Sequence, residues 1–183
     1  MKKESITLKL VTGTADPLLT EIETIYTLSF PETERRDFPL LLNLLKDTPR
    51  FTLYALLKAG NCAGFLSTWQ LEGFTYIEHF AIALSQRNSG TGTAALQQFL
   101  RNCPTPVILE VEPPTDSLTC RRISFYNRLG FQLSPVPYKQ PPYRAGEDWL
   151  NMCLMSCGNI DLPACFPSVI SSIYTAVYHN QKQ

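Results

Sequence analysis

The stretch that decides the fold is residues 76–93, YIEHFAIALSQRNSGTGT. Its first half is rich in aromatic and β-branched residues and predicts a strand, which runs into a polar loop. Gly90 and Gly92 lie in that loop, and apolar residues at helical spacing follow directly. A helix N-terminus presents N–H groups without intrahelical partners, and glycines let a phosphate approach the backbone closely. With the cation of Arg87 added, the loop predicts a diphosphate-binding site.

Two familiar phosphate loops fit this stretch poorly. A Walker A loop requires Lys after its last glycine, and Thr93 follows Gly92 here. A dinucleotide fingerprint, G-x-G-x-x-A, is satisfied by Gly90, Gly92 and Ala95, and Glu112 stands where a ribose-binding acid belongs. However, polar residues Ser85–Ser89 separate the strand from the first glycine, and antiparallel-looking strands come before it. A NAD-binding Rossmann protein is therefore a weaker alternative.

A third interpretation agrees with two separate blocks of sequence. Arg87–Gly92 matches R/Q-x-x-G-x-G/A, and Phe125–Phe131 reads FYNRLGF. In this order, with a strand expected at Val107–Val111 between them, the blocks resemble the GNAT superfamily of N-acetyltransferases, in particular a bacterial subgroup of it. The resemblance extends over the order of elements from residue 6 to residue 156.

The pattern of elements predicts an α/β fold. A strand and two helices come first, then three strands, a helix, a strand, a helix, two strands and a last helix. With the resemblance, this order implies a GNAT-like mixed, mostly antiparallel central sheet with helices on both faces, plus a C-terminal helix. We expect a GNAT domain over residues 1–157 and a helical extension over residues 158–183 that packs on the same domain.

The resemblance also implies roles for individual residues. Glu78 stands where several members place a general base, His79 is a second candidate, and Tyr126 matches the frequent general acid. The backbone of the strand end is expected to bind the pantetheine arm, and the loop to hold the pyrophosphate. The backbone set is Phe80, Ala81 and Ile82, and the loop set is Arg87, Asn88, Ser89, Gly90, Thr91, Gly92 and Thr93.

The implied activity is transfer of an acetyl group from acetyl-CoA to a primary amine of a small molecule or peptide, by direct attack on the thioester. Thr119 and Arg122 depart from the residues that the family often has on the later helix, which puts coenzyme contacts from that helix in doubt. The alternative from another class is a catalytically silent sensor or scaffold that binds acyl-CoA. Glu78, Glu110 and Glu112 either make the site acidic, which would favour a cationic amine, or lie elsewhere on the sheet.

Composition narrows the range of partners. Sixteen basic residues balance sixteen acidic ones, so no net charge attracts nucleic acid or an anionic membrane. The N-terminus lacks the apolar core of a signal peptide, and no uninterrupted run of apolar residues is long enough to span a membrane. Together these features predict a cytoplasmic protein. Six cysteines without a C-x-x-C pair, beside two histidines, predict reduced thiols and no metal site. The apolar face of the last helix leaves a homodimer open.

Overall fold

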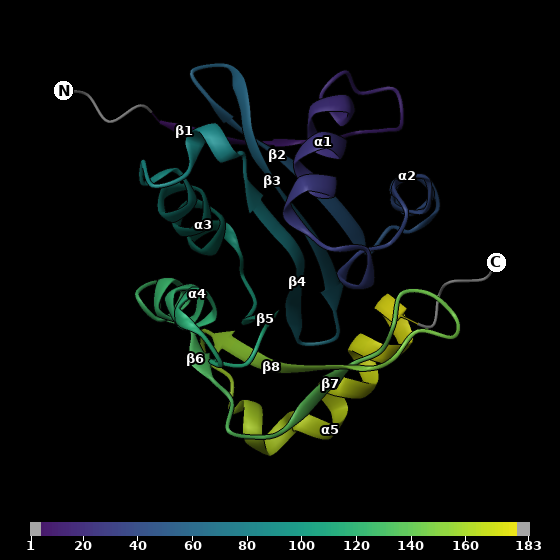
Figure 1. Cartoon of the computed structure of the whole chain (residues 1–183), viewed down its shortest axis with the longest axis vertical. Helices are drawn as coiled ribbons and strands as arrows, with labels where there is room; N and C mark the ends of the chain where they lie inside the picture. Colours follow the sequence, from purple (N-terminus) through teal and green to yellow (C-terminus); the bar gives the residue numbers. More distant parts are fainter. Residues whose placement is uncertain (1–4, 179–183) are drawn as a thin grey trace. The chain divides into compact units, whose positions relative to one another are not determined.

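The computed structural model describes residues 5–178, and Figure 1 shows the arrangement of their elements. In chain order these are β1 (Ile6–Leu10), α1 (Leu19–Ser29), η1 (Glu32–Glu34), α2 (Phe38–Asp47), β2 (Phe51–Lys58), β3 (Asn61–Leu71), β4 (Phe74–Ile82), η2 (Leu84–Gln86), α3 (Thr91–Asn102), β5 (Val107–Val111), α4 (Ser117–Asn127), β6 (Gln132–Leu133), β7 (Tyr138–Gln140), β8 (Leu150–Cys157), α5 (Leu162–Ile173) and η3 (Tyr174–Tyr178). None of the helices within residues 5–178 has the length and apolar content that crossing a bilayer requires.

The strands form one mixed sheet, in the order β1-β2-β3-β4-β5-β8-β6, with β7 paired to β8 beside this path. The β4–β5 pair is parallel, whereas β1–β2, β2–β3, β5–β8, β6–β8 and β7–β8 are antiparallel. The predicted α/β class with a mostly antiparallel sheet is therefore confirmed. The antiparallel strands that precede α3 also exclude the doubly wound parallel sheet of the Rossmann alternative.

The chain divides into two compact units, and β4 contributes to both. The first unit holds the described residues up to Trp69 together with Glu78–Asn102. The second holds Gln70–Ile77 together with the described residues from Cys103 onward. The expected division at residue 157 stays a prediction.

Helices cover both faces of β2 and β3 in the first unit. Tyr54 of β2 and Ala55 beside it point to opposite faces, as neighbouring strand residues do. Tyr54 packs against Phe99 of α3, with ring centroids 6.1 Å apart. Ala55 is paired with Phe65 of β3, whose ring lies 5.8 Å from that of Tyr26 in α1. Thus α1 and α3 bury the two faces of the same strands, and β4 continues from this core.

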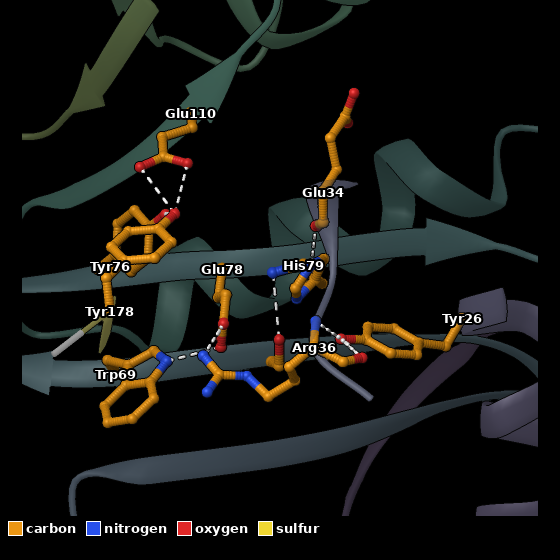
Figure 2. A network of polar contacts seen from close by, with 10 residues as sticks. Tyr26, Glu34, Arg36, Trp69, Tyr76, Glu78, His79, Glu110 and Tyr178 are labelled. Atoms are coloured by element: carbon orange, nitrogen blue, oxygen red, sulfur yellow. Dashed lines mark hydrogen bonds and ion pairs between the residues drawn. The ribbon is translucent and has the colours of Figure 1, made fainter. Parts of the chain in front are cut away.

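A carboxylate surrounded by phenols marks the second unit. Tyr178 donates its hydroxyl to both oxygens of Glu110, at 3.1 and 2.9 Å (Figure 2). Tyr138 of β7 donates to Oε1 of the same carboxylate. The hydroxyl of Tyr76 in β4 lies 3.4 Å from that of Tyr178. The cluster joins the end of the C-terminal helix to β5 through buried polar contacts.

The structure differs from the sequence-based prediction in two places. Residues 135–148 carry four prolines, which disfavour a strand, yet Tyr138–Gln140 forms β7 and pairs with β8. Prolines flank this strand instead of interrupting it, so its ladder of hydrogen bonds is preserved. The tail was expected to be helical as far as His179. Here α5 ends at Ile173 and a π-helical turn continues to Tyr178, while His179 lies outside the described residues.

We expect Tyr178→Phe to destabilise the protein by about 1–3 kcal/mol, because the half-buried carboxylate of Glu110 loses a hydrogen-bond donor to both of its oxygens. The matched control is Tyr174→Phe, which removes a hydroxyl that donates to the Lys139 carbonyl at an exposed position. Urea unfolding of the two variants measures the difference. Equal losses would show that the phenol–carboxylate contacts add nothing beyond an ordinary surface bond.

Candidate active site

The loop before α3 has the backbone geometry of an anion cradle. Asn88 and Gly90 adopt left-handed conformations, with φ of 60° and 79°. The N–H of Ala94 bonds to the carbonyl of Gly90 at 3.0 Å, which closes the first turn of α3. The N–H groups of Thr91, Gly92 and Thr93 therefore precede the first intrahelical bond and open the helix. This row of amides at the positive end of the helix dipole suits a phosphate group.

Side chains of the loop fix its conformation. Ser89 donates its hydroxyl to the Gln86 carbonyl at 2.7 Å and lies 2.8 Å from the Thr91 hydroxyl. Arg87 donates from Nε to the Ile82 carbonyl at 3.0 Å and from Nη2 to the Ser29 hydroxyl at 3.3 Å. The cation of Arg87 is thus held between the end of β4 and the end of α1, on the loop that the sequence singles out.

The end of β4 presents alternate backbone groups to its two edges. The N–H of His79 bonds to the Ser67 hydroxyl of β3 at 3.1 Å, and the N–H of Ala83 bonds to the Ala63 carbonyl at 2.9 Å. The Ala81 carbonyl also faces β3, since a Cβ built on Gly64 would lie 2.3 Å from it. Residues between these positions direct their backbone groups to the opposite edge. Of the three residues predicted to bind the pantetheine arm, Phe80 and Ile82 have this orientation and Ala81 does not.

Glu78 forms a buried ion pair. Its side chain is 1% exposed, Arg36 contacts Oε1, and Trp69 donates its indole N–H to Oε2 at 2.7 Å (Figure 2). Burial alone would raise the pKa of Glu78. The charge of Arg36, that of His79 when it is protonated at acid pH, and the hydrogen bonds from Arg36 and Trp69 outweigh burial and hold the pKa of Glu78 below its ordinary value. Glu78 is accordingly a carboxylate that stays ionised at neutral pH.

His79 contacts the same segment as Glu78. In a regular strand the two side chains would point to opposite faces, yet the His79 Nε2 atom lies 3.0 Å from the Glu34 carbonyl while Glu78 contacts Arg36. A carbonyl oxygen only accepts, so Nε2 carries the proton in this arrangement. Burial lowers the pKa of His79, against the opposing charge of Glu78, so the imidazole is neutral near pH 7. Both side chains therefore contact the segment between α1 and α2.

Tyr126 belongs to the second unit, on α4. It is 8% exposed, and its ring packs against Phe125 and Phe131 at 5.1 and 5.6 Å. Its carbonyl accepts the N–H of Leu129 at 2.9 Å and that of Phe131 at 3.2 Å, which fixes the junction from helix to strand. Burial raises the pKa of Tyr126 to about 12, although Arg122 opposes the shift. The phenol therefore stays protonated at neutral pH, as a proton donor must.

The acidic residues that the sequence left open are each engaged. Glu78 is paired with Arg36, and Glu112 with Arg122 in a partly exposed ion pair. Glu110 accepts the phenolic hydroxyls of the second unit. Among residues 5–178 no three side chains of His, Cys, Asp or Glu gather as a metal site would require.

Sequence reasoning missed Arg36 and Trp69. Arg36 lies in the charged stretch Glu32–Asp37, which is typical of a solvated loop, but the residue is 2% exposed. The only available signal was chemical, because a carboxylate on a buried strand needs a cationic partner.

The ion pair of Arg36 with Glu78 makes the folding stability of the protein depend on pH. The folded-state pKa of Glu78 is lowered, so its contribution is present above the unfolded pKa, ordinarily 4.5, and is lost as pH falls through the folded value. We expect Glu78→Gln to remove this acid-side slope. It should also cost about 3–5 kcal/mol at neutral pH, because Arg36 is left buried without its carboxylate.

The matched control is Glu112→Gln, which breaks the more exposed ion pair with Arg122 and should cost at most about 1 kcal/mol. Urea unfolding from acid to neutral pH measures both variants. An unchanged acid-side slope in Glu78→Gln would show that this carboxylate does not titrate with folding.

Comparison with known proteins agrees with this geometry. Residues 19–131 match the acetyltransferase (GNAT) family. A GNAT-family protein from Bacteroides thetaiotaomicron is 32% identical and superposes with a TM-score of 0.90, over 94% of this chain and 98% of that one. No curated protein sequence matches the chain.

More distant structures share the fold alone. The ribosomal-protein-S18-alanine N-acetyltransferase of Escherichia coli is 18% identical with a TM-score of 0.60, over 83% of this chain and 92% of that one. A GNAT-family acetyltransferase from Elizabethkingia anophelis, solved with acetyl-CoA bound, is 17% identical with a TM-score of 0.56, over 85% and 99%. The family match and the 32% identical structure together establish that this chain belongs to the GNAT acetyltransferase family.

Proposed function

We propose that the chain transfers an acetyl group from acetyl-CoA to a primary amine, of a small molecule or a peptide, by direct attack of the amine on the thioester. The observation that carries the proposal is the row of N–H groups from Thr91 to Thr93 at the start of α3, behind a glycine loop that holds Arg87. Membership of the GNAT family supports it. So does the related Elizabethkingia anophelis protein that has acetyl-CoA bound.

In this proposal the loop and the edge of β4 share the coenzyme. The amides and side chains of Arg87, Asn88, Ser89, Gly90, Thr91, Gly92 and Thr93 hold the diphosphate. The backbone groups of Phe80 and Ile82 point away from β3, which suits them to pair with the pantetheine arm and the acetyl carbonyl. Ala81 supports the same strand from its other side, because its carbonyl faces Gly64.

Two groups move the protons. Glu78 is the proposed base, and because its side chain is 1% exposed, its ionised carboxylate accepts the proton that the amine loses through a water molecule. Tyr126 is the proposed acid, and its protonated phenol supplies the proton that the departing coenzyme A sulfur takes up. The nitrogen forms a bond to the acetyl carbon, the carbon–sulfur bond breaks, and the products are an amide and free coenzyme A. No metal takes part in this scheme.

The cellular setting belongs to the same proposal. All six cysteines are free thiols, which fits a reducing compartment such as the cytoplasm. The balanced charge gives no long-range attraction for nucleic acid or membrane. The apolar positions Leu162, Phe166, Val169 and Ile173 of α5 are buried within the single chain, so a homodimer would have to use another surface.

Gly90→Ala tests the coenzyme site. Alanine in the left-handed conformation is strained by about 1–2 kcal/mol, so the unoccupied loop relaxes and binding must restore it. We expect acetyl-CoA affinity, measured by calorimetry, to fall roughly tenfold. Gly60→Ala is the matched control, since Gly60 has a similar φ of 83° and equally open surroundings in the β2–β3 turn. Equal affinities in the two variants would contradict the assignment of the loop.

Tyr126→Phe tests the acid. Loss of the phenolic proton should lower kcat by about 100-fold, the usual scale of general acid catalysis, while acetyl-CoA affinity stays unchanged. Thiol release from acetyl-CoA, against polyamines, amino acids, aminoglycosides and peptides with free N-termini, provides the assay. Phe125→Tyr/Tyr126→Phe restores a phenol one residue away and should not rescue activity. A Tyr126→Phe enzyme with normal kcat would remove the role.

The same panel separates the enzyme from a silent acyl-CoA sensor. Turnover on any amine supports the enzyme, whereas acetyl-CoA binding without turnover on every amine favours the sensor.

A further inference from the structure

Arg36 lies in the connection between α1 and α2 and is buried, so its positive charge requires compensating interactions. Its side chain is 3% exposed, and its guanidinium contacts Glu78 and lies 5.9 Å from the centre of the Trp69 ring. A buried guanidinium is costly unless a carboxylate and hydrogen bonds compensate its charge. The contacts of Arg36 thus join three separate segments: the α1–α2 connection, β3 and β4 (Figure 2).

The backbone of this connection is fixed at several points around Arg36. The Tyr26 hydroxyl accepts the N–H of Arg36 at 3.1 Å and donates to its carbonyl at 3.2 Å. The Nε2 of His79 lies 3.0 Å from the Glu34 carbonyl, and Arg35 donates to the Phe30 carbonyl at 3.1 Å. These bonds restrict the backbone conformation of Arg36. Its side chain therefore reaches Glu78 of β4 from a backbone that is already fixed.

We propose that Arg36 is a positioning residue for the transfer reaction: it keeps the Glu78 carboxylate charged and fixed on β4, and it fastens the segment Glu32–Asp37 to that strand. This inference rests on the proposed function, in which Glu78 is the base. Arg36 does not contact the reacting atoms in this scheme and acts only through Glu78.

The groups that face Glu78 decide what happens when Arg36 is removed. They are the neutral His79 beside it, the indole of Trp69 and the phenol of Tyr26. Without Arg36 the carboxylate loses its cationic contact, while the Trp69 indole still donates to Oε2. Burial then dominates, and buried carboxyl groups without a cationic partner take up a proton near neutral pH. Arg36 therefore sets the lower end of the pH range in which Glu78 can accept a proton.

The protein contains a reporter of this charge. Trp69 donates its indole N–H to Glu78, and the only other tryptophan is Trp149, which is 50% exposed. Trp149→Phe leaves Trp69 as the single fluorophore. In this background we expect no Glu78-dependent change of fluorescence above about pH 5. Adding Arg36→Met should create one with a midpoint raised by about two pH units or more. Arg36→Lys keeps the positive charge and should leave the midpoint low.

Glu78→Gln identifies the signal. A fluorescence change that persists in Glu78→Gln comes from His79 or another group, and a change that disappears belongs to Glu78. If Arg36→Met does not fold, the Trp149→Phe chain with and without Glu78→Gln still decides. A change that depends on Glu78 and is centred above about pH 5 would overturn the proposal, and its absence supports it.

The inference is also tested by enzyme activity, with an amine that the assay of thiol release from acetyl-CoA has shown to be a substrate. Arg36→Met should introduce an acid limb near neutral pH into kcat/KM, and lower it at least about tenfold at pH 7. Arg36→Lys should restore the wild-type pH profile, and acetyl-CoA affinity should be the same in all variants. A uniform loss of activity with an unchanged pH profile would mean a merely structural role and would overturn the inference.

The two proposals fail separately. If no amine is acetylated, the proposed function fails, while the Trp69 titration still reports whether Arg36 holds Glu78 in its charged form. If amines are acetylated but Arg36→Met shifts neither the titration nor the pH profile, only the inference about Arg36 fails.

Discussion

A buried carboxylate on β4 imposes the strongest constraint on the first unit. Glu78 is 1% exposed through its side chain, and leaving it charged there without partners would cost several kcal/mol. The cation that compensates it must come from a distant segment, since its neighbour His79 is neutral near pH 7. The α1–α2 connection supplies Arg36 and is in turn fixed by Tyr26 and His79. The ion pair of Arg36 with Glu78 and these hydrogen bonds together fix the path of the connection between α1 and α2.

The same strand serves a second purpose through its backbone. The groups of His79, Ala81 and Ala83 that face β3 complete the core, and those of Phe80 and Ile82 are directed to the other edge. Exposure follows this alternation: Glu78, Phe80 and Ile82 are half-buried as residues, whereas His79 and Ala81 are buried. Because the Glu78 side chain is almost fully buried, the exposed part of that residue is its main chain. β4 thus buries the Glu78 side chain while part of that residue's main chain stays exposed, and the strand leads into the loop before α3.

The features that depend on local sequence could be predicted. Two glycines and a polar run before an apolar helical pattern define the loop, and the structure has left-handed Asn88 and Gly90 there and α3 directly after. Helix starts follow the same logic, because Asp116 caps α4 through the N–H groups of Leu118 and Thr119, both at 2.8 Å. Strand β7 was missed since its three residues lie among prolines, where propensity argues against a strand. Its pairing with β8 overrides that local preference.

The partners of charged side chains could not be predicted in the same way. Glu78 lies within β4 and Glu112 directly follows β5, and each is bound by an arginine, yet one pair is buried and the other is partly exposed. The difference depends on which segments pack over each glutamate, and this packing is set by the tertiary fold. In the sequence Arg36 is one of several charges between Glu32 and Asp37, a pattern that ordinarily indicates a solvated surface. Its burial can be understood only from the tertiary fold, in which β4 places Glu78 against it, and each of the two charges compensates the other.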